Sequence, residues 1–301
     1  MTENMRIITE NLIASYNKYI TEFWVQEMDL SKNANERKSL DIIASGWGDA
    51  ECELLGKTPK DYIGESLPEE IDFDDIIGMF NSFAVGATFD IPDAVCDLFF
   101  SAPEAAEEYL ISVIDDMDLS INGDDKISDE ENKKLCIFIE AVSNLHRITK
   151  EKAKDALFGV YGKCSENNPS ILEVACNSMI KCGFVSDMIS LFETIDKIGV
   201  KEHFILQELV HIQGDEDVFK CLKSCLKKDC DDMSMTVQIV SDCGDGRLIP
   251  LIRKIARNEL KALYAAGKTP YDESEEANKF FIICNAVTRL GGSIEDLLTF
   301  D

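Results

Sequence analysis

Apolar residues recur along most of the chain with the three- and four-residue spacing of amphipathic helices. Residues 4–28 show this spacing first, and residues 129–147, 149–164 and 273–290 show it again. No stretch of the sequence alternates apolar and polar residues as a half-buried strand would. The pattern predicts an all-α fold.

Three segments in the C-terminal half repeat one pattern every thirty or thirty-one residues, counted from Gly183, Gly214 and Gly244. Apolar residues stand nine and four positions before each glycine and five, eight and twelve positions after it. These residues are Val174, Met179, Met188, Leu191 and Ile195, then Ile205, Val210, Phe219, Leu222 and Leu226, then Met235, Val240, Ile249, Ile252 and Ala256. The offsets place them on one face of two successive helices.

Each glycine is expected to end the first helix in the left-handed conformation, and the aspartate or serine that follows can cap the second helix. The predicted unit is therefore helix, tight turn, helix. Gly86 begins a fourth copy, with Ile91 and Pro92 at the offsets of Ile249 and Pro250, and Gly292 begins a truncated fifth. A fixed period of this length is typical of a solenoid, in which each helix pair buries its apolar face against its neighbours.

The segments "GDGRLIPLIRKI" (244–255) and "GATFDIPDAVCDL" (86–98) resemble bacterial HEAT-type repeats in the turn and in the "IP" that opens the second helix. The resemblance is clearest over residues 170–260. It implies an α-solenoid of helical hairpins that binds other proteins, although a few HEAT arrays are enzymes. We expect this solenoid over residues 63–301, with a possible loop insertion at 118–128, and an N-terminal helical cap over residues 1–62.

The charge of the chain limits the classes of partner that such an array could bind. The formal net charge is −27, and the 65 residues between Lys60 and Lys126 contain 18 acids and no Lys or Arg. A field of this sign repels phosphate backbones, so the sequence argues against nucleic-acid binding and favours a basic protein as the partner. A protein that neutralises a basic toxin or nuclease, as an immunity or antagonist protein does, would fit.

One loop resembles the calcium-binding loop of EF-hand proteins, which needs oxygen ligands at alternate positions and a final glutamate. In "SINGDDKISDEE" (120–131) the candidate calcium ligands are Ser120, Asn122, Asp124, the carbonyl of Lys126, Ser128 and Glu131. Ser120 stands where an aspartate is expected, and Asp125 replaces the turn glycine. A register that starts at Asp118 restores Asp and Gly123 but places Asp129 last. The alternative interpretation is a capping box, in which Ser128 caps a helix and Glu131 reaches back.

Two further patterns are assigned structural roles. "GKTP" occurs at residues 56–59 and 267–270 without the upstream glycine of a P-loop, so each copy is expected to end one helix and start the next. Cys221 and Cys225 share one helical stripe near His203 and His211, and we assign them to the core rather than to zinc.

The sequence therefore predicts a non-enzymatic, protein-binding scaffold without a cofactor. A calcium-responsive helical module, acting through residues 118–131, and a HEAT-array enzyme remain as alternatives. No run of eighteen apolar residues predicts a membrane span, and the first residues lack the pattern of a cleaved signal peptide. Eleven cysteines, an odd number scattered through helical stretches, are expected to be free thiols of a cytoplasmic protein.

Overall fold

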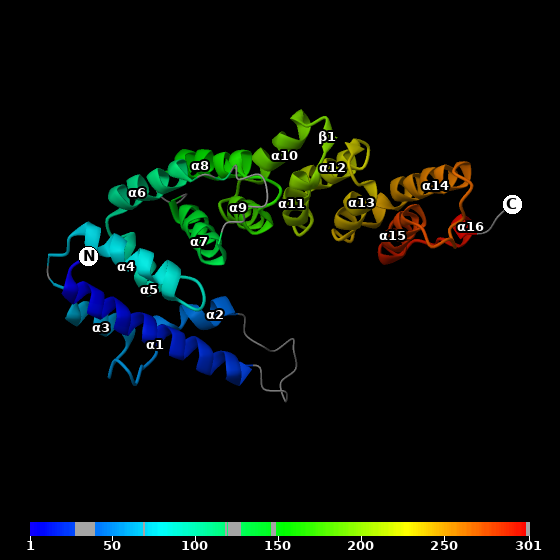
Figure 1. The fold of residues 1–301 in the computed structure, drawn as a ribbon. Coiled ribbons are helices and arrows are strands. Elements are labelled where there is room, and N and C mark those ends of the chain that lie inside the picture. The colour runs from blue at the N-terminus through cyan, green and yellow to red at the C-terminus, as the bar shows by residue number, and fades with distance from the viewer. Residues whose placement is uncertain (28–39, 69, 118, 120–127, 146–148, 299–301) are drawn as a thin grey trace. The chain divides into compact units, whose positions relative to one another are not determined.

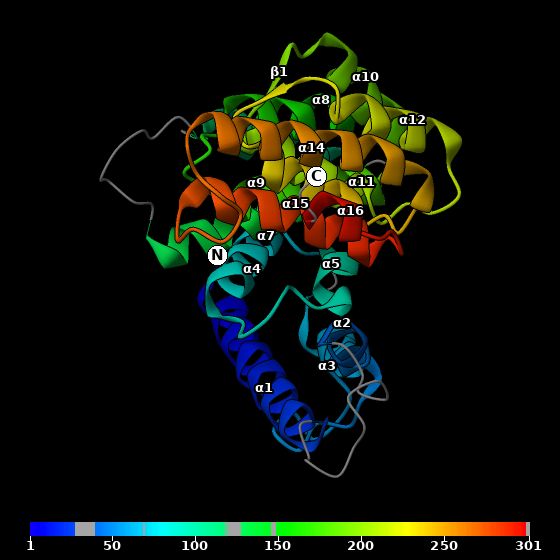
Figure 2. The ribbon, with the colours of Figure 1, turned by 90° about the vertical axis from the view of Figure 1, so that its right-hand side faces the viewer.

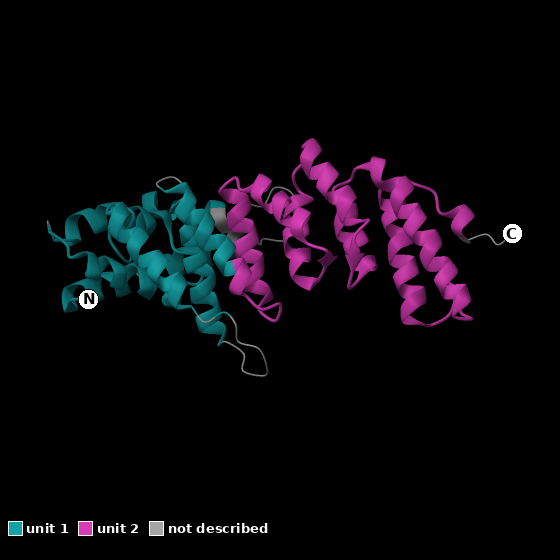
Figure 3. Cartoon of the chain, turned by 90° about the horizontal axis from the view of Figure 1, so that it is seen from above, with its two compact units in different colours: residues 1–160 teal, residues 161–301 magenta. Residues whose placement is uncertain are grey.

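The computed structural model describes the chain except for residues 28–39, 69, 118, 120–127, 146–148 and 299–301. The fold is mostly helical, which confirms the all-α prediction (Figure 1). Two compact units are present, unit 1 (residues 1–160) and unit 2 (residues 161–301), coloured separately in Figure 3. The boundary expected between residues 62 and 63 falls inside a helix of unit 1. None of the helices among the described residues is long and apolar enough to cross a membrane.

Unit 1 contains the first seven α-helices and most of the eighth. Their bounds are α1 (Glu3–Glu27), α2 (Leu40–Ser45), α3 (Pro59–Ser66), α4 (Phe73–Gly86), α5 (Asp93–Phe99), α6 (Pro103–Asp116), α7 (Asp129–Leu145) and α8 (Lys150–Lys163), with a short 3-10 helix η2 (Trp47–Asp49) after α2. Helix α4 lies at the centre of the unit, because α1, α5 and α7 all pack against it.

Aromatic side chains fill the core of unit 1. Trp47 is fully buried and packs edge to face against Tyr16, with 5.2 Å between ring centroids. Its indole N–H donates a hydrogen bond to the hydroxyl of Ser15 at 3.3 Å. Further along α4, Phe80 stacks on Phe99 with 4.2 Å between centroids. The segment before residue 60 is therefore joined to α4 by a continuous apolar core.

Unit 2 is a succession of helical pairs. Its elements are α9 (Pro169–Lys181), α10 (Val185–Thr194), β1 (Lys197–Ile198), α11 (Val200–Leu209), α12 (Glu216–Cys225), β2 (Asp229–Cys230), α13 (Met233–Ser241), η3 (Gly246–Leu248), α14 (Ile249–Ala265), α15 (Glu275–Arg289) and α16 (Glu295–Leu298). The first helices of the pairs pack in sequence, α9 on α11, α11 on α13 and α13 on α15, and α10 packs on α12. Figure 2 shows α14 and α15 side by side.

The turns between paired helices contain the glycines of the repeat. Gly183, Gly214 and Gly244 have φ values of +75°, +78° and +70°, in the left-handed region that a side chain disfavours. Gly86 differs, since it is the last residue of α4 and has no positive φ. The expectation that Gly86 ends its helix in the left-handed conformation is wrong, because Ala87 leaves that helix through extended backbone instead.

Helix capping follows the repeat only in part. The carboxylate of Asp215 accepts hydrogen bonds from the backbone N–H groups of Asp217 and Val218, and Asp245 caps η3 through the N–H of Arg247. In the pair that follows Gly183, no side chain caps α10, and Ser186 lies within the helix. A cap was therefore wrongly expected there.

The expected apolar face is buried at most repeat positions. Met179, Val210 and Val240 are all at most 3% exposed, because each lies where the first helix of its pair meets the second. Five positions are half-buried: Val174, Leu191, Ile195, Phe219 and Ile249. Met235 is exposed, at 44%, and lies in the first turn of α13, where its N–H donates to the cap residue Asp232.

Short strands join two successive pairs of unit 2, and the sequence pattern did not predict them. β1 and β2 run parallel, with Lys197 opposite Asp229 and Ile198 opposite Cys230. The N–H of Asp231 donates to the carbonyl of Ile198 at 2.9 Å, which extends the pairing. Two-residue strands are too short to leave a hydrophobic period, so their pairing depends on the stacking of the helices around them.

The two "GKTP" segments have different structures. Thr58 caps α3 by accepting a hydrogen bond from the N–H of Asp61, and Pro59 is its first residue, as expected. After Gly267, however, Thr269 and Pro270 lie in a turn, and α15 begins only at Glu275 with Ser274 as its cap. The expectation of a helix start at Pro270 is wrong because Ser274 offers a hydroxyl that accepts from the N–H of Ala277.

Replacing Gly214 by alanine tests the turn conformation. We expect Gly214→Ala to lower the free energy of unfolding by about 1 kcal/mol, because an L-residue is strained at this φ. The added methyl would meet nothing within 4 Å, so strain alone determines the effect. Urea unfolding followed by circular dichroism measures it.

The matched control is Gly162→Ala in the last turn of α8, where an added methyl also meets no neighbour but φ is not positive. This variant should be unchanged or slightly more stable. Equal losses in the two variants would contradict a conformational role for Gly214.

Candidate functional site

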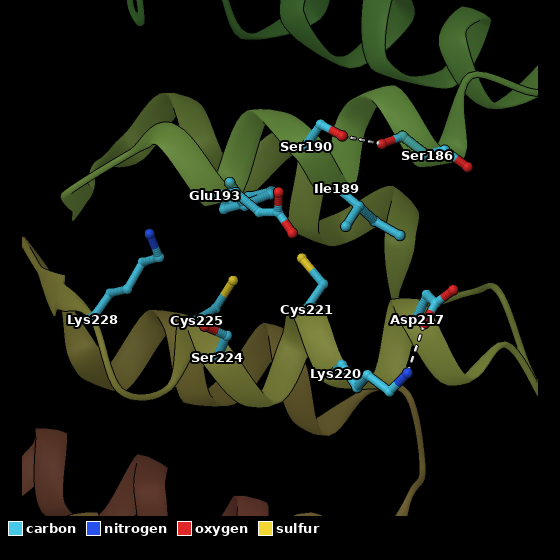
Figure 4. Close-up of a pocket in the computed structure, with 11 residues that line it drawn as sticks. Ser186, Ile189, Ser190, Glu193, Asp217, Lys220, Cys221, Ser224, Cys225 and Lys228 are labelled. Carbon is cyan, nitrogen blue, oxygen red and sulfur yellow. Dashed lines mark hydrogen bonds and ion pairs between the residues drawn. The ribbon is translucent and has the colours of Figure 1, made fainter.

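A cleft in unit 2 lies between α10 and α12, the second helices of two successive pairs (Figure 4). Its volume is about 620 Å³. The lining residues are Ser186, Ile189, Ser190, Phe192 and Glu193 from α10 and its first turn, and Asp217, Lys220, Cys221, Ser224, Cys225 and Lys228 from α12 and the turn after it. The sequence expected a binding groove along second helices, and the cleft lies on two of them.

Charged side chains surround the cleft, and two of them are held in place. At one end the ammonium of Lys220 forms an ion pair with Asp217 at 2.8 Å. At the other end Lys228 donates a hydrogen bond to the carbonyl of Ile195, at the end of α10. The carboxylate of Glu193 lies on α10 opposite the two cysteines (Figure 4). The cleft therefore combines fixed charges of both signs with an apolar floor.

The thiols of Cys221 and Cys225 form the floor on the α12 side. Both residues are buried, at 7% and 0% exposure, as expected for the apolar stripe of this helix. A hydrogen bond from Cys225 lowers the pKa of the Cys221 thiol, although burial and the nearby Glu193 oppose this effect. The same hydrogen bond raises the pKa of Cys225, and its burial acts in the same direction.

The second candidate site is the acidic surface of unit 1. We define it as the exposed acidic residues between Lys60 and Lys126, a stretch that contains no Lys or Arg. Eleven of its fourteen described acidic residues are exposed: Asp61, Glu65, Glu70, Asp72, Asp74, Asp93, Asp97, Glu104, Glu108, Asp115 and Asp116. The two buried acids are paired, Asp75 with the N-terminal ammonium and Glu107 with Lys152. Glu65 is exposed and paired with Lys57, so pairing is not confined to buried acids, but most of the negative charge faces solvent.

Four carboxylates lie near Cys96 on α5. Burial, as the largest cause, and the charges of Asp93, Asp97, Glu140 and Asp90 together raise the pKa of its thiol to about 12. Lys60 lies close enough to Asp93 and Asp97 for their charges to raise its own pKa, although its main partner is Asp49 at 2.8 Å. Carboxylates from α5, from α7 and from the segment before α5 therefore lie close enough to Cys96 for their charges to act on it.

The candidate calcium ligands are only partly within the described part of the chain. Ser120, Asn122, Asp124 and Lys126 lie outside it, whereas Ser128 and Glu131 lie at the start of α7. The hydroxyl of Ser128 accepts a hydrogen bond from the N–H of Glu131 at 3.2 Å, which is the first half of the capping box.

The histidines considered for zinc do not form a metal site. The ring of His203 is buried and its Nε2 lies 2.9 Å from the hydroxyl of Thr236, while His211 is exposed. Among the described residues no group of three or more His, Cys, Asp or Glu side chains could hold a metal ion. His146 lies outside the described residues.

Comparison of the chain with protein-family models, with curated proteins and with solved structures gives no match. The function must therefore be argued from the two surfaces described above.

The buried imidazole of His203 predicts a pH dependence. Burial lowers its pKa, so the folded chain keeps this ring neutral while the unfolded chain gains a proton as the pH falls below about 6.5. The stability that His203 contributes is complete above pH 6.5 and decreases as the pH falls from there toward the lowered folded-state pKa.

We expect the wild-type chain to lose more free energy of unfolding between pH 7 and pH 5 than His203→Gln, whose amide can still bond Thr236. Urea titrations at a series of pH values measure the difference between the two proteins. Parallel pH profiles would show that the histidine remains accessible to protons in the folded state.

Proposed function

We propose that the helical pairs of unit 2 belong to an α-solenoid of HEAT-like hairpins. Three observations support this proposal: the left-handed glycines at a spacing of thirty or thirty-one residues, the sequential packing of α9, α11, α13 and α15, and the parallel pairing of β1 with β2. Residues 197 and 229 pair at a separation close to one repeat, as neighbouring copies of one linker would.

Arg247 supports the same proposal because it links one turn to the preceding one. Its guanidinium carbon lies 3.7 Å above the ring centroid of Phe219, and its nitrogens contact Glu216 at 3.0 Å and Asp245 at 2.7 Å. A cation over an aromatic face at an exposed site contributes about 0.5–1 kcal/mol. Contacts of this kind between equivalent turns keep successive hairpins in register.

A crystal structure of the full chain tests the solenoid. We expect the pairs α9–α10, α11–α12 and α13–α14 to superpose on one another through one similar rotation and translation per step. Pairs related by unlike rotations would contradict a repeat array, even if each pair remained a helical hairpin.

We propose that the protein is a non-enzymatic scaffold that binds a basic protein through the acidic surface of unit 1. The observation that carries this proposal is that eleven acidic side chains are exposed over a stretch that contains no Lys or Arg. Single exposed ion pairs contribute little to stability, so such a concentration is not needed to hold the fold. A surface of one sign instead raises the association rate of an oppositely charged partner and selects against acidic ones.

The partner class follows from the same charge. Nucleic acids are polyanions and would be repelled, whereas a Lys- or Arg-rich protein surface would be attracted. A basic toxin or nuclease neutralised by this chain remains one specific form of the proposal. The eleven cysteines, an odd number and all free thiols, support a cytoplasmic location as part of it.

Affinity capture from the native cell at low salt, compared between two charge variants, tests the proposal. The first variant neutralises four exposed acids of α5 and α6: Asp93→Asn, Asp97→Asn, Glu104→Gln and Glu108→Gln. The matched control removes the same charge from unit 2: Glu166→Gln, Glu173→Gln, Asp196→Asn and Glu273→Gln. All eight side chains are exposed.

We expect the wild type and the control to retain the same basic protein, and the first variant to bind it about tenfold more weakly, because roughly 1.4 kcal/mol of electrostatic attraction is lost. Isothermal titration of the purified partner gives the affinities, and the difference should shrink as salt is raised. Equal affinities of both variants, or a partner without net positive charge, would rule out this surface.

A further inference from the structure

A further cleft lies in unit 1, between the second half of α1 and the loop that follows η2. Its volume is about 340 Å³, and all the residues that line it belong to unit 1. Helix α1 contributes Tyr19, Glu22 and Phe23, and the loop contributes Glu51, Glu53 and Leu54. The cleft therefore combines apolar side chains with carboxylates from both of its walls.

The apolar side chains of this cleft are open to solvent. Tyr19 and Phe23 are one helical turn apart on α1, and their ring centroids are 4.4 Å apart. Phe23 is 38% exposed, and Leu54 on the opposite wall is 57% exposed. A single exposed apolar side chain is ordinary, whereas apolar side chains that gather around one opening indicate an interaction site.

The loop wall is held in place without a ligand. The N–H of Cys52 donates to the carbonyl of Lys57 at 3.3 Å, and the N–H of Gly56 donates to the carbonyl of Cys52 at 2.9 Å. An ion pair of 3.0 Å between Lys18 and Glu53 joins α1 to the loop. A cleft that is formed in advance binds with less loss of conformational entropy.

Carboxylates outnumber cations among the side chains that line the cleft. Glu22, Glu51 and Glu53 are exposed, and Lys18 is the one basic residue beside them. Lys18 bonds Glu53 and lies 3.8 Å from Glu22. Three negative charges and one positive charge leave two negative charges around the opening, so the cleft attracts cations.

We propose that this cleft binds one face of a basic amphipathic helix, in which bulky apolar side chains are flanked by lysines or arginines. The inference rests on the proposed function, because the basic protein bound by the acidic surface would supply the helix. An amphipathic helix placed in an apolar groove is a common mode of peptide recognition. Tyr19, Phe23 and Leu54 contact its apolar side chains.

The charge around the cleft selects against the other occupants of such a surface. A second copy of this chain would bring a formal net charge of −27 toward the same carboxylates, and an acidic peptide would be repelled in the same way. Like charges placed opposite one another lower affinity, whereas flanking cations would face Glu22, Glu51 and Glu53. The occupant must therefore be both apolar and cationic.

Two synthetic peptides of about fourteen residues, long enough for a helix that spans the cleft, test the inference. Both carry lysines on one helical face, and the other face carries leucines in the first peptide and alanines in the second. We expect the full-length protein to bind the leucine peptide about tenfold more tightly, because only leucine buries a large apolar surface in the cleft. Isothermal titration at one salt concentration measures both affinities.

The double variant Phe23→Ala, Leu54→Ala should lose most of this preference for leucine. The matched control is Ile7→Ala, Val85→Ala, whose side chains are similarly exposed but do not line the cleft, and it should keep the preference. If circular dichroism shows that the first variant is unfolded, Leu54→Ala alone provides the same measurement, because its side chain is mostly exposed.

Equal binding of the two peptides, no binding of either, or a preference that both double variants keep would overturn the inference. None of these results would decide the proposal for the acidic surface, which affinity capture with its own charge variants tests separately. A wild-type dimer in analytical ultracentrifugation that Phe23→Ala, Leu54→Ala abolishes would identify a second copy of the chain as the occupant and would also overturn the inference.

Discussion

Unit 2 depends on one constraint. Each helix must bury its apolar face against a helix of the neighbouring helical pair. A hairpin of two short helices cannot cover its own hydrophobic surface, so α9 needs α11, α11 needs α13 and α13 needs α15. The left-handed turns at Gly183, Gly214 and Gly244 make the hairpins tight enough for this contact. Polar links such as Arg247 with Glu216 then fix the alignment of neighbouring turns.

Unit 1 meets the same need in a different way. Its helices surround α4, and the rings of Tyr16, Trp47 and Phe83 form one aromatic cluster at its end. Because the core is supplied by large rings packed from several elements, acidic residues on the outside can repel one another at little cost to the fold. The concentration of exposed carboxylates is thus compatible with stability and available for recognition.

The proposed recognition surface lies on unit 1. Recognition by the acidic surface acts through long-range charge and weakens with salt.

The sequence determined the helical class, the positions of most helices and the three glycine turns of unit 2, because periodicity and turn chemistry are local properties. It also determined the charge of the stretch between Lys60 and Lys126. Three expectations were wrong. Gly86 forms no left-handed turn, because the chain leaves α4 through Ala87 in extended backbone. No side chain caps α10, so Ser186 is not its cap, and α15 begins after Ser274 rather than at Pro270. Only the tertiary structure paired β1 with β2 and placed Cys221 and Cys225 at the base of a cleft, because both results require the packing of one helical pair against another.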